Sequence, residues 1–111
     1  MKTHILCLGD SNTHGYCADP NDCADHGIRF NEEERWTCRL QKALGDEYLV
    51  TEEGLSGRTT VFVDPIHESM DALSVIYALL KSHEVIDLLI IMLGTNDVKA
   101  VSYTHLRAHE T

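Results

Sequence analysis

The sequence lacks any apolar run approaching the roughly 20 residues that a membrane-spanning helix needs, and residues 1–9 lack the long apolar region and cleavage site of a signal peptide. Positive charge is also scarce, because nine Lys and Arg residues face 18 Asp and Glu residues, for a net charge of −9. An acidic surface repels phosphate backbones and anionic lipids. We therefore expect neither nucleic acid nor a membrane among the partners.

There is no C-x-x-C pair, and no two histidines lie at metal-ligand spacing beside a carboxylate or cysteine cluster. His105 and His109 could share one face of a helix, but without further ligands a zinc site there is not expected. The cysteines are interpreted as reduced thiols, with a disulfide as the less favoured alternative: Cys7, Cys17, Cys23 and Cys38. These features predict a cytoplasmic protein without a metal site.

The composition is that of one small globular domain. With 111 residues, 43% hydrophobic and 24% charged, the chain is long enough for one core and too short for two, and disorder is not expected. Neither internal repeats nor low-complexity segments occur.

Three short apolar segments, 4–8, 47–53 and 87–93, predict β-strands. The first and third show no alternation of apolar and polar residues, which is typical of strands buried on both faces of a parallel sheet. Residues 16–30 contain Pro20 and Gly27 and are expected to form a long loop, a kind of segment that often carries function.

Two segments between the strands have the apolar spacing of amphipathic helices. One follows Asn31, a predicted N-cap with Glu34 as its capping-box partner, and ends at Gly45. The other spans residues 68–83, and its expected buried stripe consists of Met70, Leu73, Ile76, Tyr77 and Leu80. The order β-α-β-α-β predicts an α/β fold with right-handed crossovers and a parallel sheet covered by helices on both faces.

In such sheets the ligand site lies beyond the carboxyl ends of the strands. Residues 9–15, 54–60 and 94–97 each follow a predicted strand and contain glycine, so we expect them to converge on one crevice. In the first segment, Gly9 permits a sharp turn and Ser11 begins a helix. The Ser11 hydroxyl is thereby held toward the crevice, and its own backbone N–H is an unpaired donor aimed at developing negative charge.

The other two segments offer further donors to the same negative charge. The Gly57 N–H could approach a substrate oxygen, and the Asn96 side-chain amide could donate to it. The simpler alternative is that Ser11, Asn96 and Asp97 only cap helices and that Gly57 only makes a turn. Their occurrence in order, each after a predicted strand, favours one site.

These residues carry a resemblance to a known family. Gly9-Asp10-Ser11, Gly57 and Gly94-Thr95-Asn96-Asp97 resemble the first three sequence blocks of the SGNH (GDSL) hydrolase superfamily. The strings EEGLSGRTT (52–60) and IIMLGTNDVKA (90–100), together with Arg35-Trp36-Thr37, are similar to its bacterial arylesterase/acyltransferase branch.

The resemblance implies a flavodoxin-like three-layer α/β/α sandwich, here truncated after the third strand, and no cofactor. It makes Ser11 the nucleophile, with the oxyanion held by the Ser11 N–H, the Gly57 N–H and the Asn96 side chain, and with Asp10 and Asp97 as supporting residues. The expected function is that of a serine esterase or acyltransferase that hydrolyses or transfers the short acyl groups of small esters. The full-length parent is a possible homo-oligomer.

The family takes its base from an Asp-x-x-His block near its C-terminus, and no such block follows Asp97 in this chain. Asp64-Pro65-Ile66-His67 has the right spacing but lies before the third block, so it is interpreted as a loop-to-helix transition. His14 is expected to line the rim of the pocket. Without the base, we expect the chain to be impaired.

Residues 101–111 do not continue the resemblance and are expected to be a non-native or disordered tail, so that residues 1–100 form the N-terminal part of one hydrolase domain. We also expect a fragment with unpaired strand edges to be marginally stable. Two alternatives of the same superfamily are a carbohydrate deacetylase and a lysophospholipase or thioesterase. A third is a non-catalytic flavodoxin-like module that binds phosphate at the Ser11 helix, which the negative charges of Asp10 and Asp97 disfavour.

Overall fold

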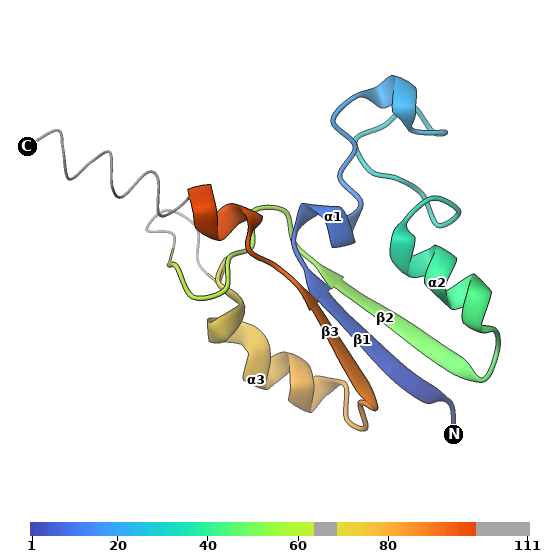
Figure 1. Ribbon diagram of the computed structural model, residues 1–111, viewed down its shortest axis with the longest axis vertical. Helices are drawn as coiled ribbons and strands as arrows, with labels where there is room; N and C mark the ends of the chain where they lie inside the picture. Colours follow the sequence, from blue (N-terminus) through green and yellow to red (C-terminus); the bar gives the residue numbers. More distant parts are fainter. Residues whose placement is uncertain (64–68, 100–111) are drawn as a thin grey trace, which may run out of the picture.

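The computed structural model describes residues 1–63 and 69–99. The described strands and helices follow one another as β1 (Thr3–Gly9), α1 (Ser11–His14), the short 3-10 helix η1 (Pro20–Asp22), α2 (Trp36–Leu44), β2 (Tyr48–Gly54), α3 (Ala72–Ser82) and β3 (Leu88–Met92) (Figure 1). Residues 95–99 are also helical. The three predicted strands are therefore present, each within two residues of its expected bounds.

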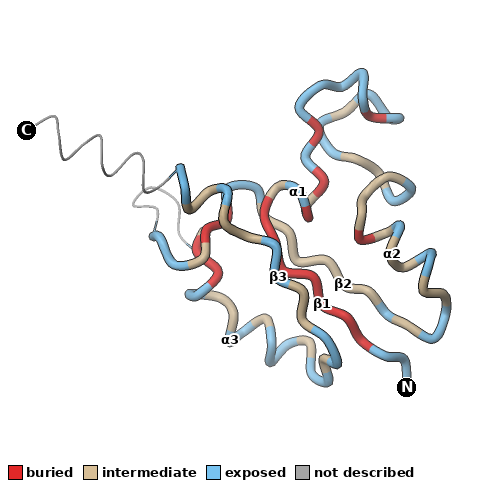
Figure 2. The backbone as a smooth tube through the Cα atoms, viewed as in Figure 1, coloured by how far each residue is buried: buried red, intermediate tan, exposed pale blue. Residues whose placement is uncertain are grey.

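The strands form one parallel sheet in the order β2-β1-β3, with β1 in the centre. Buried residues are concentrated along β1, where Leu6, Cys7 and Leu8 are at most 2% exposed (Figure 2). A strand flanked on both sides and covered on both faces loses almost all its solvent contact, which explains its unbroken apolar sequence. Burial also raises the pKa of the Cys7 thiol, and all four cysteines are free.

Helices α2 and α3 cover opposite faces of the sheet. Glu52 and Glu53 are neighbours on β2 and therefore point to opposite faces. The Glu52 carboxylate bonds Arg35 and Thr37 at the start of α2, whereas Glu53 contacts His83 at the end of α3, at 2.7 Å. The predicted α/β fold with a parallel sheet between two helical layers is thus confirmed.

Helix α2 begins later than the capping pattern at Asn31 predicted. The hydrogen bonds of a capping box are present, because the Asn31 side chain accepts from the Glu33 N–H and Glu34 accepts from the Asn31 N–H. Residues 32–34 nevertheless form a turn, and the backbone of Arg35 is extended, so α2 starts only at Trp36. The Glu34 carboxylate also accepts from the Ala24 N–H, which ties this turn to the loop instead of to the helix.

Within α3, the predicted buried stripe is wrong except for Ile76. In α3 the exposed fractions of Leu73 and Tyr77 are 64% and 74%, and Leu80 is also exposed. The side that faces the sheet instead holds Ala72, Val75, Ile76 and Leu79. Both sets have helical spacing, so the sequence pattern could not decide which one faces the core.

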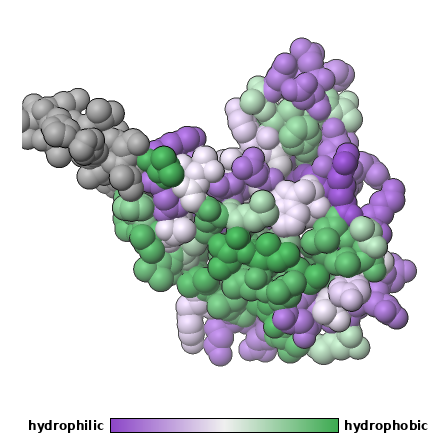
Figure 3. Space-filling view, viewed as in Figure 1, coloured by the Kyte–Doolittle hydropathy of each residue, from purple (hydrophilic) through white to green (hydrophobic). Residues whose placement is uncertain are grey.

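β3 adds a second set of exposed apolar side chains. Leu88, Ile91 and Met92 are each about half exposed, since β3 is an edge of the sheet formed by the described residues. The prediction that this strand is buried on both faces is therefore wrong for the described residues. Hydrophobic side chains gather in the region where β3 lies (Figure 3). None of the described helices has the length and apolar character needed to cross a bilayer.

Candidate active site

The segments that follow the three strands meet at one edge of the sheet. After β2, the Leu55 N–H donates to the carbonyl oxygen of Gly9 at the end of β1, at 3.2 Å. After β3, Nδ2 of Asn96 donates to the carbonyl oxygen of Arg58, at 3.1 Å. The predicted convergence of residues from all three segments is therefore present.

Ser11 is the first residue of α1, and Asp10 is the residue that caps this helix. The buried carboxylate of Asp10 accepts a hydrogen bond from the Asn12 N–H, at 3.1 Å. The alternative in which Ser11 serves only as the cap is therefore wrong. The Ser11 N–H has no hydrogen-bond partner among the described residues, as is usual for the first residue of a helix.

Two glycines bring α1 directly against the ends of β1 and β2. A Cβ atom on Gly54 would lie 2.2 Å from the backbone nitrogen of His14, and one on Gly9 would lie 2.0 Å from Oγ1 of Thr13. Gly9 was expected to permit a sharp turn, but its φ is not positive, so its role is to leave space for α1. No role was predicted for Gly54, which is the last residue of β2.

Gly57 occupies the position in its turn that requires glycine. The Arg58 N–H donates to the carbonyl oxygen of Leu55, at 3.1 Å, which closes a four-residue turn. Gly57 is the third residue of this turn and has a φ of +86°, which favours glycine there. Its N–H has no hydrogen-bond partner among the residues described, so it remains available to a substrate oxygen.

Asn96 and Asp97 lie in the helical residues 95–99. One hydrogen of the Asn96 amide is used by the carbonyl oxygen of Arg58, and an amide nitrogen carries two, so one donor remains. The Asp97 carboxylate accepts from the backbone N–H of Thr60, at 3.0 Å, and from its hydroxyl group. Asp97 thus fixes residues 95–99 against the Gly57 turn.

A pocket of about 720 Å³ opens at this edge of the sheet. Ser11, Gly57 and Asn96, the three residues of the predicted oxyanion hole, all line it. Its other lining residues are His14, Tyr16, Ile28, Arg29, Ser56 and Lys99. His14 was expected at the rim of such a pocket, and residues 16–30 supply one of its walls, as their prediction as a functional loop suggested.

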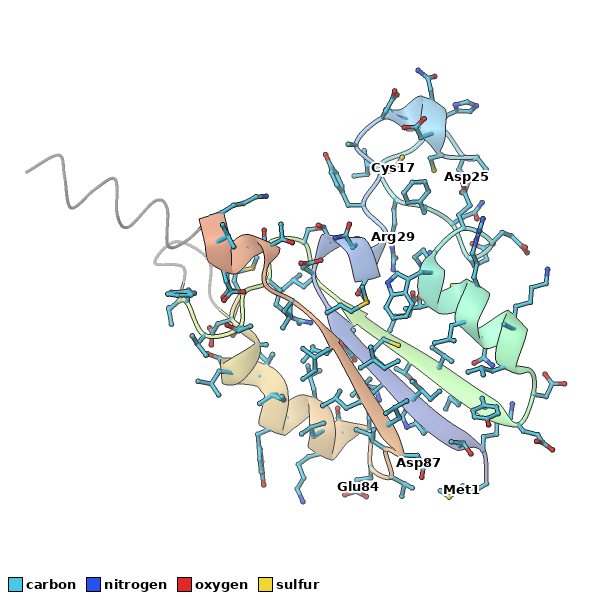
Figure 4. The ribbon with its side chains drawn as sticks, in the orientation of Figure 1. Met1, Cys17, Asp25, Arg29, Glu84 and Asp87 are labelled. Carbon is cyan, nitrogen blue, oxygen red and sulfur yellow. The ribbon has the colours of Figure 1, made fainter. Side chains whose placement is uncertain are left out.

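The loop wall is held in place by hydrogen bonds to main-chain carbonyl groups. Arg29 Nε donates to the carbonyl oxygen of His14 at 2.8 Å, between the loop and α1 (Figure 4). The Cys17 N–H donates to the carbonyl oxygen of Ile28, also at 2.8 Å. These bonds connect both ends of the loop, so the exposed side chains of Tyr16 and Ile28 stand beside the nucleophile segment. Nothing in the sequence pattern had assigned Tyr16, Ile28 or Arg29 to the site.

The charges in this pocket differ from those that the sequence suggested. Asp10 and Asp97 were expected to place negative charge at the ligand site, but neither is among its lining residues, and both carboxylates accept hydrogen bonds from the chain. Arg29 and Lys99 do line it. The helix that begins at Ser11 has only four residues, so its dipole is small.

A base for Ser11 is not provided by the part of the chain that the structure describes. Within residues 1–63 and 69–99, no side chain forms a hydrogen bond to the Ser11 hydroxyl, His14 included. Asp64 and His67, as well as His105 and His109, lie outside these residues. In the same two ranges, no three His, Cys, Asp or Glu residues gather as metal ligands.

An ion pair supports the site from the α2 side of the sheet. Arg35 holds Glu52 with two hydrogen bonds, at 3.0 and 2.8 Å, and the Thr37 hydroxyl donates to the same carboxylate. Burial alone would raise the pKa of Glu52, but these donors and the charges of Arg35 and Arg29 hold it below its usual value. The stem of Arg35 also packs where a Cβ on Gly15 would stand, just after α1.

A sequence model of the GDSL-like Lipase/Acylhydrolase family matches residues 7–108. No curated protein matches the chain significantly.

Among solved structures, the aryl esterase of M. smegmatis is 42% identical, with a TM-score of 0.76 over 86% of this chain and 43% of its own. Est24, a carbohydrate acetylesterase from Sinorhizobium meliloti, is 41% identical, with a TM-score of 0.77 over 86% and 44%. A candidate arylesterase from Agrobacterium tumefaciens str. C58 is 39% identical, with a TM-score of 0.75 over 91% and 46%. The chain therefore spans less than half the length of each of these structures.

Proposed function

The chain belongs to the GDSL-like lipase/acylhydrolase family, and from this premise we propose that it serves as the nucleophile-bearing part of a serine esterase for small acyl esters. The observation that carries the proposal is that Ser11, Gly57 and Asn96 line one pocket although they follow three different strands. A hydroxyl nucleophile beside several unpaired N–H donors is the arrangement that acyl transfer requires.

The proposed reaction has two steps. Ser11 Oγ attacks the ester carbonyl carbon and loses its proton to a base that residues 1–63 and 69–99 do not supply, while the carbonyl oxygen becomes negative and is held by the N–H groups of Ser11, Gly57 and Asn96. The alcohol then leaves with a proton, and an acyl group remains on Ser11. Water or a second alcohol attacks this acyl-enzyme and frees the serine, which gives hydrolysis or acyl transfer, respectively.

The walls of the pocket support a small substrate. Tyr16 and Ile28 offer apolar surface to an aryl or short acyl group, while Ser56 and Asn96 are polar. A carbohydrate acetylester is the second candidate, since Est24 is described as an enzyme of that kind. Comparing kcat/KM for an aryl acetate and an acetylated sugar separates the two.

Hydrolysis of 4-nitrophenyl acetate tests the role of Ser11. Serine hydrolases that lack their triad retain about 10³–10⁴-fold catalysis over water from the oxyanion hole and binding alone, so we expect slow turnover that is measurable. Ser11→Ala should remove the part of this rate that passes through an acyl-serine, and Asn96→Ala should lower the total rate by about 10²–10³-fold, the usual effect of removing one oxyanion donor.

Ser82→Ala is the matched control, because Ser82 is exposed at the end of α3 and is not among the residues that line the pocket. It should retain the wild-type rate. Equal rates for wild type and Ser11→Ala would remove Ser11 from the mechanism. Phosphate binding in a titration, without labelling of Ser11 by a fluorophosphonate, would favour the non-catalytic module instead.

The cellular location, the extent of the domain and the oligomeric state are also proposals. Four free cysteines are compatible with a reducing compartment, which supports the cytoplasm as the location. The match over residues 7–108 supports one hydrolase domain but does not end at residue 100, so the domain boundary there and the non-native tail stay predictions. Homo-oligomer formation stays a prediction.

A further inference from the structure

Arg58 is a buried cation that contacts all three segments of the candidate site. Its exposed fraction is 7%, and it directly follows Gly57. Nη1 donates to the carbonyl oxygen of Glu53 at 2.7 Å and, more weakly, to that of Gly9 at 3.4 Å. Its own carbonyl oxygen accepts from Asn96 Nδ2 at 3.1 Å.

These contacts relate Arg58 to each proposed oxyanion donor. Gly9 lies two residues before Ser11, and Gly57 is joined to Arg58 by a peptide bond. The Asn96 amide is held by the Arg58 carbonyl group itself. Movement of Arg58 would therefore move the Ser11, Gly57 and Asn96 donors relative to one another.

An arginine suits this place for a physical reason. Each terminal nitrogen of its planar guanidinium carries two N–H groups in a fixed arrangement, so Nη1 alone can bond two carbonyl oxygens that belong to different strands. Burial lowers the pKa of Arg58, an effect that the negative charge of Glu53 opposes, and an arginine remains charged under all ordinary conditions. The carbonyl groups of Gly9 and Glu53 each accept a hydrogen bond from this charged donor.

We propose that Arg58 is a positioning residue that holds the three oxyanion donors of the pocket in one geometry. The effect of Arg58 on catalysis rests on the proposed function, whereas its effect on the structure does not. In acyl transfer, a displacement of about 1 Å can cost about 10²-fold in rate, so a residue that touches no substrate can still control kcat.

Amide hydrogen exchange tests the structural part on the whole chain. The variants are Arg58→Gln, Arg58→Lys and, as the matched control, Arg39→Gln, which changes an exposed arginine on α2. The reporters are the N–H groups of Leu55 and of residue 58, which donate to the carbonyl oxygens of Gly9 and Leu55, respectively. The reference is the Val50 N–H, which Gln41 binds elsewhere on β2.

In Arg58→Gln we expect exchange at both reporters to accelerate at least tenfold relative to Val50. Arg58→Lys, which retains one charged donor, should show a smaller acceleration, and Arg39→Gln none. Acceleration of all three amides by the same factor would show that Arg58 only contributes to global stability, and no acceleration would show that it holds nothing. Either result overturns the proposal.

The effect of Arg58 on catalysis is measured as the rate of 4-nitrophenyl acetate hydrolysis in excess of the rate of the Ser11→Ala variant. Arg58→Gln should lower kcat at least tenfold with KM changed less than twofold, and Arg58→Lys should recover part of the loss. An unchanged kcat would overturn the catalytic consequence. If wild type and Ser11→Ala are equally slow, the proposed function fails, and hydrogen exchange still decides whether Arg58 positions the three segments.

Discussion

Asp97 accepts hydrogen bonds from both the backbone N–H and the hydroxyl group of Thr60, at 3.0 and 2.5 Å, although 37 residues separate them in the chain. Thr60 lies three residues after Gly57, and Asp97 directly follows Asn96. The pair therefore connects the segments that carry two of the three proposed oxyanion donors. Asp97 supports the site through the backbone of its neighbours, without lining the pocket.

Replacing Asp97 with alanine should destabilise the protein. The change leaves the Thr60 N–H and hydroxyl without their charged acceptor, and hydrogen bonds to charged groups each contribute about 1.5–3 kcal/mol. We expect the free energy of unfolding, measured by urea denaturation with Trp36 fluorescence, to fall by at least about 1.5–3 kcal/mol, the contribution of one such bond. Asp46→Ala, at an exposed residue with no such contacts, should change little, and equal losses in both variants would contradict this role.

Gly54→Ala should be among the most damaging small substitutions in the chain. The new Cβ atom would lie 2.2 Å from the His14 nitrogen and 2.6 Å from the Thr13 carbonyl carbon, and both are backbone atoms that cannot rotate away. Forcing extra volume into a packed site costs about 1–3 kcal/mol or more. Gly27→Ala is the control, because its Cβ would meet nothing within 4 Å. Similar urea midpoints for the two variants would show that α1 does not depend on this contact.

Acid should weaken the fold through Glu52. Its pKa in the folded protein lies below the ordinary value of 4.5, so its contribution to stability is present above that pH and is lost as the pH falls through the lower folded value. Glu52→Gln should therefore lower stability at pH 7 and flatten its decline below about pH 4.5. Glu47→Gln, at an exposed position, should leave the wild-type profile unchanged. Parallel acid profiles for wild type and Glu52→Gln would refute this account.

The apolar edge formed by β3 should make the 111-residue chain self-associate. An edge strand with exposed apolar side chains can pair with another copy. Changing Leu88 and Met92 together to lysine should reduce the mass-average molar mass in sedimentation at a fixed protein concentration. Leu73→Lys, on the exposed side of α3, tests whether the strand matters more than the helix. An equal reduction by Leu73→Lys would contradict the edge-strand explanation.

The predictable features are those that depend on neighbours in the chain. Unbroken apolar runs identified β1 and β3 as parallel strands, although only β1 is buried, and the residues that follow each strand identified the edge where the site forms. Ser11, Gly57 and Asn96 could be named because the local sequence around each matches a motif. Asn31 and Glu34 also make their predicted hydrogen bonds, but a contact to Ala24 directs that turn away from helix.

By itself, the sequence determined the strand order in the chain, the parallel sheet and the serine-bearing turn, because hydrophobic periodicity and glycine placement act over a few residues. Only the tertiary structure decided that Ala72 and not Leu73 faces the sheet, that Gly54 makes room for α1, and that Arg58 touches all three segments. Each of these results depends on contacts between residues that are distant in the chain, such as Gly9 and Arg58, which are 49 residues apart. Burial and hydrogen bonding at that range follow from how the layers pack, which no single segment contains.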